Sequence, residues 1–114
     1  SEAVLKEAPS IVIEIVSTNW EEDYRNKPLC YAAFGVSELW IIDPLFTVDR
    51  YPNRKNPKIQ EPTISIGQLV TSRSILVERE YEFQSFTEKQ PIESRFFPDL
   101  NLTVEEIIGY GKGI

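Results

Sequence analysis

A run of β-branched residues near the start of the chain predicts the first strand. Residues 10–16 read Ser-Ile-Val-Ile-Glu-Ile-Val, with one acid inside an otherwise apolar run. Continuous apolar runs of this length are typical of strands that are buried on both faces inside parallel sheets. Residues 39–43, which read Leu-Trp-Ile-Ile-Asp, predict a second buried strand of the same kind.

The segment between these two strands predicts a helix. Ser17 and Thr18 can cap its start, and Gly35 stands just beyond its expected end. Proline is tolerated only in the first turn of a helix, so Pro28 predicts that the helix begins near Asn26 or is broken there. Strand, helix and strand at this spacing form a βαβ unit, and we expect its two strands to be parallel.

Alternation of apolar and polar positions predicts further strands in the second half of the chain. Residues 47–51 and 63–66 have strand-like composition. In residues 75–86 the side chains of Ile75, Val77, Tyr81 and Phe83 share one face, and acidic side chains occupy the other. This pattern predicts a sheet with one solvated face.

A short helix is predicted near the end of the chain. Thr103 and Glu106 have the spacing of a capping box, in which each side chain satisfies a backbone N–H group of the other residue. No repeat and no composition shift marks a domain boundary. We therefore expect one domain over residues 1–114, with a core in residues 9–51 and C-terminal strands and a helix in residues 52–114.

The composition changes the picture mainly through its absences. The 114 residues include no histidine, no methionine and one cysteine, and 12 basic against 18 acidic residues give a net charge of −6. Without histidine, catalytic sites of the Ser-His-Asp or Cys-His type and zinc sites of the Cys/His type are excluded. A metal ion would therefore be a hard cation such as Mg²⁺ or Mn²⁺, held by oxygen atoms.

Cys30 cannot form an internal disulfide, because it is the only cysteine in the sequence. Its apolar neighbours predict that it behaves as a small buried side chain. An unpaired thiol fits a reducing cytoplasm. No run of residues approaches the length of a membrane span, so we expect no membrane partner.

Glu14 is the most informative position, because it puts a carboxylate in the middle of a strand that is predicted to be buried. Burial of an unpaired carboxylate costs on the order of several kcal/mol, so we expect a partner for it. Strand alternation places it on the face of Val12 and Val16. It is either a metal ligand, or the partner of a Lys or Arg side chain, or a group that points out at an uncovered edge.

Three residues of the predicted helix could join Glu14. Asp23, Lys27 and Tyr31 stand at positions i, i+4 and i+8, so a continuous helix places them on one face. An Asp–Lys pair at this spacing is often only a surface ion pair. This face, however, follows directly from the strand of Glu14 and could bring an ammonium group to the same site. Ser17 is a better helix cap than nucleophile, because no base is present to activate it.

The remaining candidates are less specific. Trp40 is predicted to be part of the core, and Asp43 is predicted to form a turn. Arg54, Lys55 and Lys58 lie in a proline-rich loop, where they contact phosphate or are simply solvated. A net charge of −6 argues against strong nonspecific binding to DNA. It does not exclude a nuclease, whose metal ions offset acidic ligands locally.

Taken together, these residues resemble the Uma2 family. The resemblance is specific in the first part of the chain and extends to a segment before the predicted C-terminal helix. It is carried by residues 8–17, by Asp23, Lys27 and Tyr31, by residues 35–44, and by residues 97–102.

The resemblance implies the restriction-endonuclease-like fold of the PD-(D/E)XK superfamily, an α/β (α+β) mixed sheet with flanking helices. It implies a DNA endonuclease that depends on Mg²⁺ or Mn²⁺, with Glu14 as catalytic acid and metal ligand. Val16 occupies the position that normally holds the catalytic lysine of the superfamily. The resemblance assigns that role to Lys27, which would steady the attacking hydroxide or the developing charge, with Asp23, Ser17 and Tyr31 in support.

The resemblance also implies an N-terminal helix and a hairpin that carries a first metal-binding Asp. The residues before Pro9 are too few to form them, and the lack of methionine also predicts a chain that lacks its beginning. We therefore expect a partial domain, the C-terminal portion of a DNA endonuclease. The alternative is a naturally shortened, catalytically degenerate protein of the same fold that forms a homodimer or binds nucleic acid, because proteins rarely leave a sheet edge open.

Overall fold

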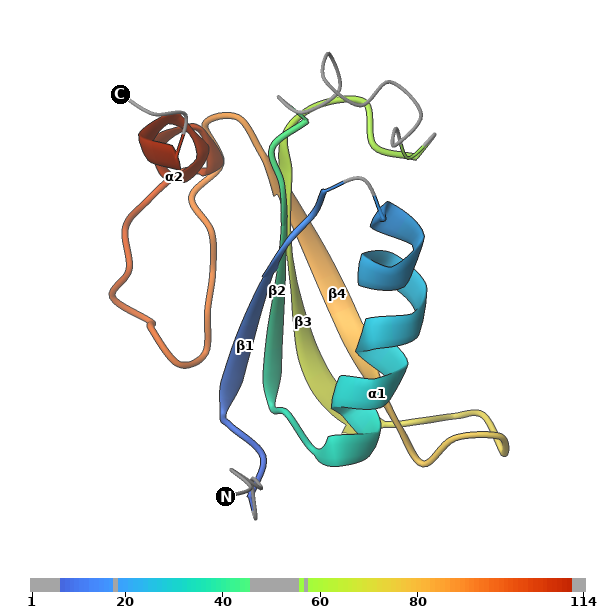
Figure 1. Cartoon of the computed structure of the whole chain (residues 1–114). Coiled ribbons are helices and arrows are strands. Elements are labelled where there is room, and N and C mark those ends of the chain that lie inside the picture. Colours follow the sequence, from blue (N-terminus) through green and yellow to red (C-terminus); the bar gives the residue numbers. More distant parts are fainter. Residues whose placement is uncertain (1–6, 18, 46–55, 57, 112–114) are drawn as a thin grey trace, which may run out of the picture.

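In the computed structural model, the described part of the chain forms one mixed sheet with a helix on each face (Figure 1). The structure describes residues 7–17, 19–45, 56 and 58–111. The first strand runs parallel to the second, and the other neighbours are antiparallel. This arrangement confirms the expected mixed sheet with flanking helices. In their order across the sheet, the strands are β1 (Ile11–Ile15), β2 (Glu38–Asp43), β3 (Thr63–Thr71) and β4 (Arg79–Thr87).

The helix between β1 and β2 changes its winding just before its proline. A π-helix, η1 (Glu22–Asn26), leads directly into α1 (Lys27–Phe34), and Pro28 stands in the first turn of the α-helical part. The change coincides with the missing N–H of Pro28, which cannot donate an α-helical hydrogen bond. The prediction that the helix begins or is broken near Asn26 is wrong: helical residues continue without a gap from Trp20 to Phe34, and only the winding changes there. Gly35 ends the helix in the left-handed conformation, at φ 98°, as its position predicts.

Apolar side chains form a cluster on each face of the sheet. The cluster next to α2 (Val104–Gly111) contains Trp40, whose predicted place in the core is confirmed. The cluster next to the first helix is smaller and is bordered by tyrosine side chains. The first cluster consists of Trp40, Ile64, Ile66, Phe86, Ile92, Val104 and Ile108; the second consists of Val16, Leu39 and Ile41, with Trp20, Tyr24, Tyr31 and Tyr81 packed around them.

The prediction that β1 is buried on both faces is wrong. β1 lies at one end of the strand order, and the side chains of Ile13 and Ile15 are 50% and 65% exposed. These two side chains point to the α2 side of the sheet, where the apolar cluster is centred on the other three strands. The apolar run therefore predicted the strand correctly but its burial wrongly, because the sequence pattern does not show which elements cover each face of the strand.

The strand predicted over residues 75–86 begins later than its alternation indicates. β4 starts at Arg79, which is paired with Thr71, and Ile75 and Leu76 lie almost fully exposed in the connection from β3. The hydroxyls of Ser72 and Ser74 accept hydrogen bonds from backbone N–H groups two residues on. Such local bonds favour a turn over a strand.

The predicted capping box at the start of α2 is confirmed. The Thr103 hydroxyl accepts a hydrogen bond from the backbone N–H of Glu106 at 3.2 Å, and the Glu106 carboxylate accepts one from the N–H of Thr103 at 3.0 Å. Cys30, by contrast, is exposed rather than buried. The strand predicted over residues 47–51 lies outside the described residues. None of the described helices is both long and apolar enough to cross a membrane.

Candidate active site

Glu14 lies in the middle of β1 and points to the side of the sheet that carries the first helix. It shares this face with Val12 and Val16, as strand alternation predicts, and it is in register with Ile41 of β2. Its side chain is 19% exposed, so it is largely shielded but still open to a ligand. Because this face of the sheet carries the first helix, the carboxylate meets side chains of that helix.

The first helix supplies two partners for this carboxylate, Tyr31 and Lys27, and a second carboxylate, Asp23, that bonds to the same lysine. The hydroxyl of Tyr31 donates a hydrogen bond of 2.5 Å to Glu14 Oε2, and Lys27 Nζ lies 3.5 Å from Glu14 Oε1. The same Nζ lies 3.0 Å from Asp23 Oδ1. The expected shared helix face and its proximity to the strand of Glu14 are therefore both observed. We call Glu14, Asp23, Lys27 and Tyr31 the acid–lysine cluster.

The cluster fixes the protonation of its lysine and its tyrosine. The hydrogen bond to Asp23, with the attraction of both carboxylates, raises the pKa of Lys27 above its ordinary value of 10.5, although burial acts in the opposite direction. The hydrogen bond to Glu14 raises the pKa of Tyr31 to about 12. At neutral pH, Lys27 is therefore an ammonium group, and Tyr31 is a neutral phenol that donates a hydrogen bond to the carboxylate.

Two carboxylates of the cluster are available as oxygen ligands for a cation. Glu14 and Asp23 both lie within 3.5 Å of the same lysine nitrogen, so a cation held by both carboxylates would lie next to the Lys27 ammonium group. Among residues 7–17, 19–45, 56 and 58–111, no group of three or more Asp, Glu, Cys or His side chains could hold a metal ion. Mg²⁺ is commonly bound by one or two carboxylates, with water and substrate phosphate completing its shell. The residues present fit that mode of binding.

The other predicted site residues lie outside this cluster. Ser17 is exposed, and helical structure begins only at Trp20, so Ser17 lies before the position that would cap the helix. Lys58 is exposed, and its backbone N–H donates to the side chain of Asn56. Arg54 and Lys55 lie outside the described residues. Of the three basic loop residues, the structure therefore places only Lys58.

Asp43 and Tyr24 form a contact that the sequence pattern did not predict. Asp43 has no exposed surface, and the hydroxyl of Tyr24 donates a hydrogen bond of 2.9 Å to its Oδ2. Asp43 is thus a buried acceptor at the end of β2 rather than the turn residue that the sequence predicts. The spacing of Trp20 and Tyr24, one helical turn apart, is the signal for an aromatic helix face directed at the sheet.

Glu38 is a second buried carboxylate that the sequence analysis missed. It has no exposed surface and accepts hydrogen bonds from Trp40 Nε1, Gln68 Nε2, Ser94 Oγ and the backbone N–H of Arg95, all between 2.5 and 2.8 Å. Burial alone would raise its pKa, but these hydrogen bonds lower the pKa below the ordinary value of 4.5. Because Ser94 and Arg95 both donate hydrogen bonds to it, Glu38 holds the segment after β4 against the sheet.

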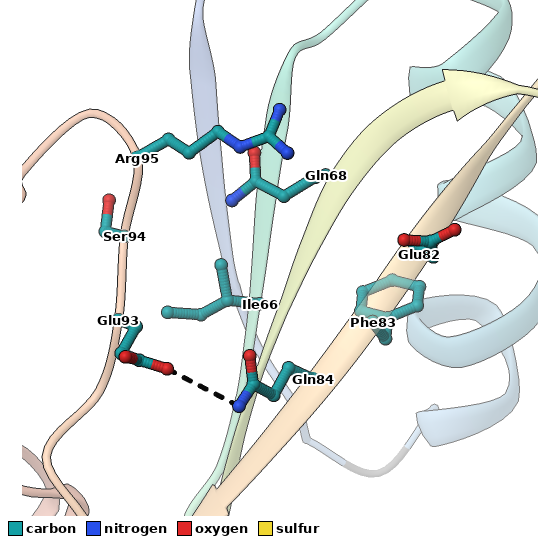
Figure 2. Close-up of a pocket in the computed structure, with 8 residues that line it drawn as sticks. All are labelled: Ile66, Gln68, Glu82, Phe83, Gln84, Glu93, Ser94 and Arg95. Carbon is teal, nitrogen blue, oxygen red and sulfur yellow. Dashed lines mark hydrogen bonds between the residues drawn. The ribbon is translucent and has the colours of Figure 1, made fainter.

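A hollow of about 550 Å³ lies on the α2 side of the sheet (Figure 2), and its lining includes three residues that bond to Glu38. Its lining includes two carboxylates, Glu82 and Glu93, and one guanidinium, that of Arg95. Gln84 donates a hydrogen bond of 3.5 Å to Glu93 across it. Strand alternation puts this hollow on the opposite face from Glu14, and its carboxylates disfavour phosphate. It is therefore not part of the acid–lysine cluster.

The comparison with protein families identifies the group to which this chain belongs. The model of the Uma2 family, described as "Putative restriction endonuclease", matches residues 1–105. No match was found among the curated proteins. The family match covers both β1 and the first helix, which together supply the acid–lysine cluster. The chain belongs to the Uma2 family.

Proposed function

We propose that this protein is a DNA endonuclease that hydrolyses phosphodiester bonds with the help of Mg²⁺ or Mn²⁺. The observation that carries the proposal is the convergence of Glu14 and Asp23 on the ammonium group of Lys27. A lysine held between two carboxylates, close to an oxygen site for a hard cation, suits a reaction in which negative charge develops on phosphate. Membership of a family described as "Putative restriction endonuclease" supports DNA as the substrate.

Each residue of the acid–lysine cluster has a proposed role. Glu14 and Asp23 would hold the cation, which when bound supplies an activated water molecule and screens the phosphate charge. Lys27, whose pKa is raised by its bond to Asp23, remains charged and stabilises the developing charge or positions the attacking hydroxide. Tyr31 keeps the Glu14 carboxylate in place through its hydrogen bond to Oε2.

The proposal is tested by DNA cleavage with and without divalent metal. Wild-type protein is expected to convert supercoiled plasmid to nicked or linear forms with Mg²⁺ or Mn²⁺, and to be inactive in a chelator. Glu14→Gln keeps the size of the side chain but removes its charge, and it should abolish cleavage. Glu93→Gln, at an exposed carboxylate on the opposite face, is the matched control. Wild-type protein that is inert with both metals on all DNA substrates would falsify the proposal.

A homodimer is a second proposal, supported by the exposed side of β1. Ile13 and Ile15 are both at least half exposed on a strand that ends the sheet order. Edge strands with exposed apolar side chains are usually covered by another segment or another chain. Two copies could pair their β1 strands about a twofold axis and bury these side chains. Such a dimer is compatible with the nuclease or with a catalytically degenerate protein of the same fold.

Sedimentation distinguishes these possibilities from a monomer. Wild-type protein is expected to sediment as a dimer, and Ile13→Lys with Ile15→Lys should shift it to a monomer, while Ile75→Lys, at an exposed loop position, should leave the dimer intact. A dimer that neither binds Mg²⁺ nor cuts DNA supports the degenerate form. A wild-type protein that sediments as a monomer at high concentration contradicts the dimer.

A further inference from the structure

A cavity of about 490 Å³ lies beside the acid–lysine cluster, between the first helix and the sheet. Four residues form one row across the sheet by strand register, in the order Glu14, Ile41, Ser65 and Ser85. The last three line the cavity. Because neighbouring strands lie about 4.8 Å apart, the wall of the cavity begins one strand away from the Glu14 carboxylate. Its volume is in the range of sites for small organic ligands.

Aromatic side chains border the cavity from both the helix and the sheet. Trp20 and Tyr24 come from the helix, and Phe83 comes from β4. The ring of Phe83 leans on Gly67, where a Cβ atom would lie only 2.7 Å from the ring. The absence of a side chain at Gly67 therefore permits this position of the ring. Flat aromatic groups in such an arrangement suit the stacking of a nucleobase.

The polar groups of the cavity can bond to the edge of a base. Ser65 Oγ and Ser85 Oγ share one hydrogen bond of 2.9 Å, and since the pair has two hydroxyl protons, one O–H remains available to a ligand. Asn56 is buried, and its Oδ1 accepts the N–H of Lys58, which leaves its NH₂ group as a donor. These groups are few, as expected of a site that fixes the orientation of a largely apolar ligand.

The charged residues at the cavity suit phosphate. Arg25 and Lys58 line it, both are exposed, and none of the described lining residues is acidic. The Arg25 guanidinium lies 5.7 Å from the centre of the Trp20 ring, and both residues line the cavity. Its ion pair with Glu21, at 3.4 Å between two exposed side chains, is weak enough to be exchanged for a phosphate.

We propose that this cavity binds one unpaired nucleotide of the DNA strand next to the phosphate that is cut. The inference rests on the proposed nuclease function and narrows its substrate. A base can stack between Trp20, Tyr24 and Phe83 only after it leaves the duplex, so the substrate is single-stranded or locally opened DNA. The base occupies the aromatic cavity, Arg25 and Lys58 hold phosphate at its entrance, and the adjacent phosphate is presented to Glu14 and Lys27.

Binding without metal tests the cavity independently of catalysis. The probe is a fluorescently labelled single-stranded oligonucleotide, compared with the same oligonucleotide in a fully paired duplex, in chelator and by fluorescence anisotropy. The single strand is expected to bind at least roughly 10-fold more tightly than the duplex, because stacking on aromatic side chains requires an unpaired base. Equal binding of the two probes overturns the inference.

Two substitutions of low structural risk locate the binding in the cavity. Phe83→Leu, at a side chain that is 43% exposed, should weaken single-strand binding by roughly 5- to 100-fold, the usual effect of losing one stacking partner. Arg25→Gln should weaken single-strand binding less than Phe83→Leu does. It should also reduce the slope of log affinity against log salt concentration by about 1, the effect of losing one phosphate contact. Phe34→Leu and Arg73→Gln, both exposed outside the cavity, are the matched controls. Binding that is unchanged in Phe83→Leu overturns the inference.

The experiments give different results when the nucleotide-binding proposal is wrong and when the nuclease proposal is wrong. If wild-type protein cuts DNA in a Glu14-dependent manner but Phe83→Leu changes neither binding nor the preference for single strands, the cavity does not bind the nucleotide. The proposed nuclease function is then still supported. If single-strand binding depends on Phe83 and Arg25 but no DNA is cut with either metal, the proposed nuclease function is wrong. The proposed nucleotide site is then still supported.

Discussion

The hydroxyl of Tyr31 donates a hydrogen bond to Glu14, and this bond ties the first helix to the edge strand of the sheet. The two residues are 17 positions apart in the sequence, on elements that are joined by the π-helical turn. The bond raises the pKa of Tyr31 to about 12, so a titration of the phenol reveals whether the Glu14 carboxylate is next to it. The geometry of the proposed site can therefore be tested without any activity.

Glu14→Gln should lower the pKa of Tyr31 from about 12 toward the ordinary value of 10, because the neutral amide no longer favours the protonated phenol. Titration of phenolate absorbance in the ultraviolet measures this shift, and Tyr31→Phe identifies the signal. Tyr81 serves as an internal control, since burial raises its pKa to about 12 and its hydroxyl bonds to the carbonyl of Val36. A late-titrating Tyr31 that persists in Glu14→Gln would contradict the hydrogen bond.

Alkaline pH should lower the free energy of unfolding, because two groups of the acid–lysine cluster lose their protons. The pKa values of Lys27 and Tyr31 are both raised in the folded state, so the folded protein holds these protons more tightly than the unfolded chain. Their contribution to stability is complete below pH 10 and is lost as the pH rises through the raised values. Lys27→Met should cost more than about 1 kcal/mol at neutral pH, because it leaves the buried carboxylate of Asp23 without its lysine, and it should make stability less dependent on alkaline pH. Denaturant unfolding at neutral and alkaline pH measures both effects.

Divalent metal should stabilise the wild-type protein and leave Glu14→Gln unchanged. A ligand that binds only the folded state adds about 1.4 kcal/mol of stability at ten times its dissociation constant. Thermal unfolding with increasing Mg²⁺ or Mn²⁺ measures this gain, and Ca²⁺ serves to compare a larger cation. Glu93→Gln, on the opposite face, should respond as wild type does. An equal response of Glu14→Gln and wild type would place the bound metal elsewhere.

Glu38 should control stability rather than activity. Glu38→Ala leaves four donors without their acceptor, two of them on the buried side chains of Trp40 and Ser94, and the expected loss is about 3 kcal/mol. Since the folded-state pKa is lowered, the contribution of Glu38 is complete above its ordinary pKa of 4.5 and is lost as the pH falls through the lowered value. Unfolding experiments at acid pH should show a flatter acid limb in Glu38→Ala. Glu82→Gln, at an exposed carboxylate on β4, is the control, and an equal effect of both substitutions would refute this role.

The strands and the helix could be predicted where local pattern is sufficient. The apolar run of β1 and β2, the left-handed Gly35 and the Thr103–Glu106 capping box all depend on residues close in sequence, and all are found as predicted. The spacing of Asp23, Lys27 and Tyr31 likewise predicted one helix face, and the predicted direction of Glu14 from β1 was correct.

The parts that could not be predicted depend on tertiary contacts. The exposure of Ile13 and Ile15 depends on which elements cover the α2 side of β1, and no local pattern reports that. Glu38 is buried because Ser94 and Arg95, more than fifty residues away, bring donors to it. The aromatic cavity combines the helix with β3 and β4, so its lining is visible only once strand register is known.

The most direct test of the proposed function is the single-turnover rate of DNA cleavage with Mg²⁺ or Mn²⁺ in wild type, Glu14→Gln and Lys27→Met, with folding of each variant checked by circular dichroism. The account predicts metal-dependent cleavage by the wild type, on an opened or single-stranded substrate, and losses of roughly 100-fold or more in both variants, the usual effect of removing a group that stabilises the transition state. Cleavage that is unaffected by either substitution, or a folded wild type that cuts no DNA with either metal, would contradict it.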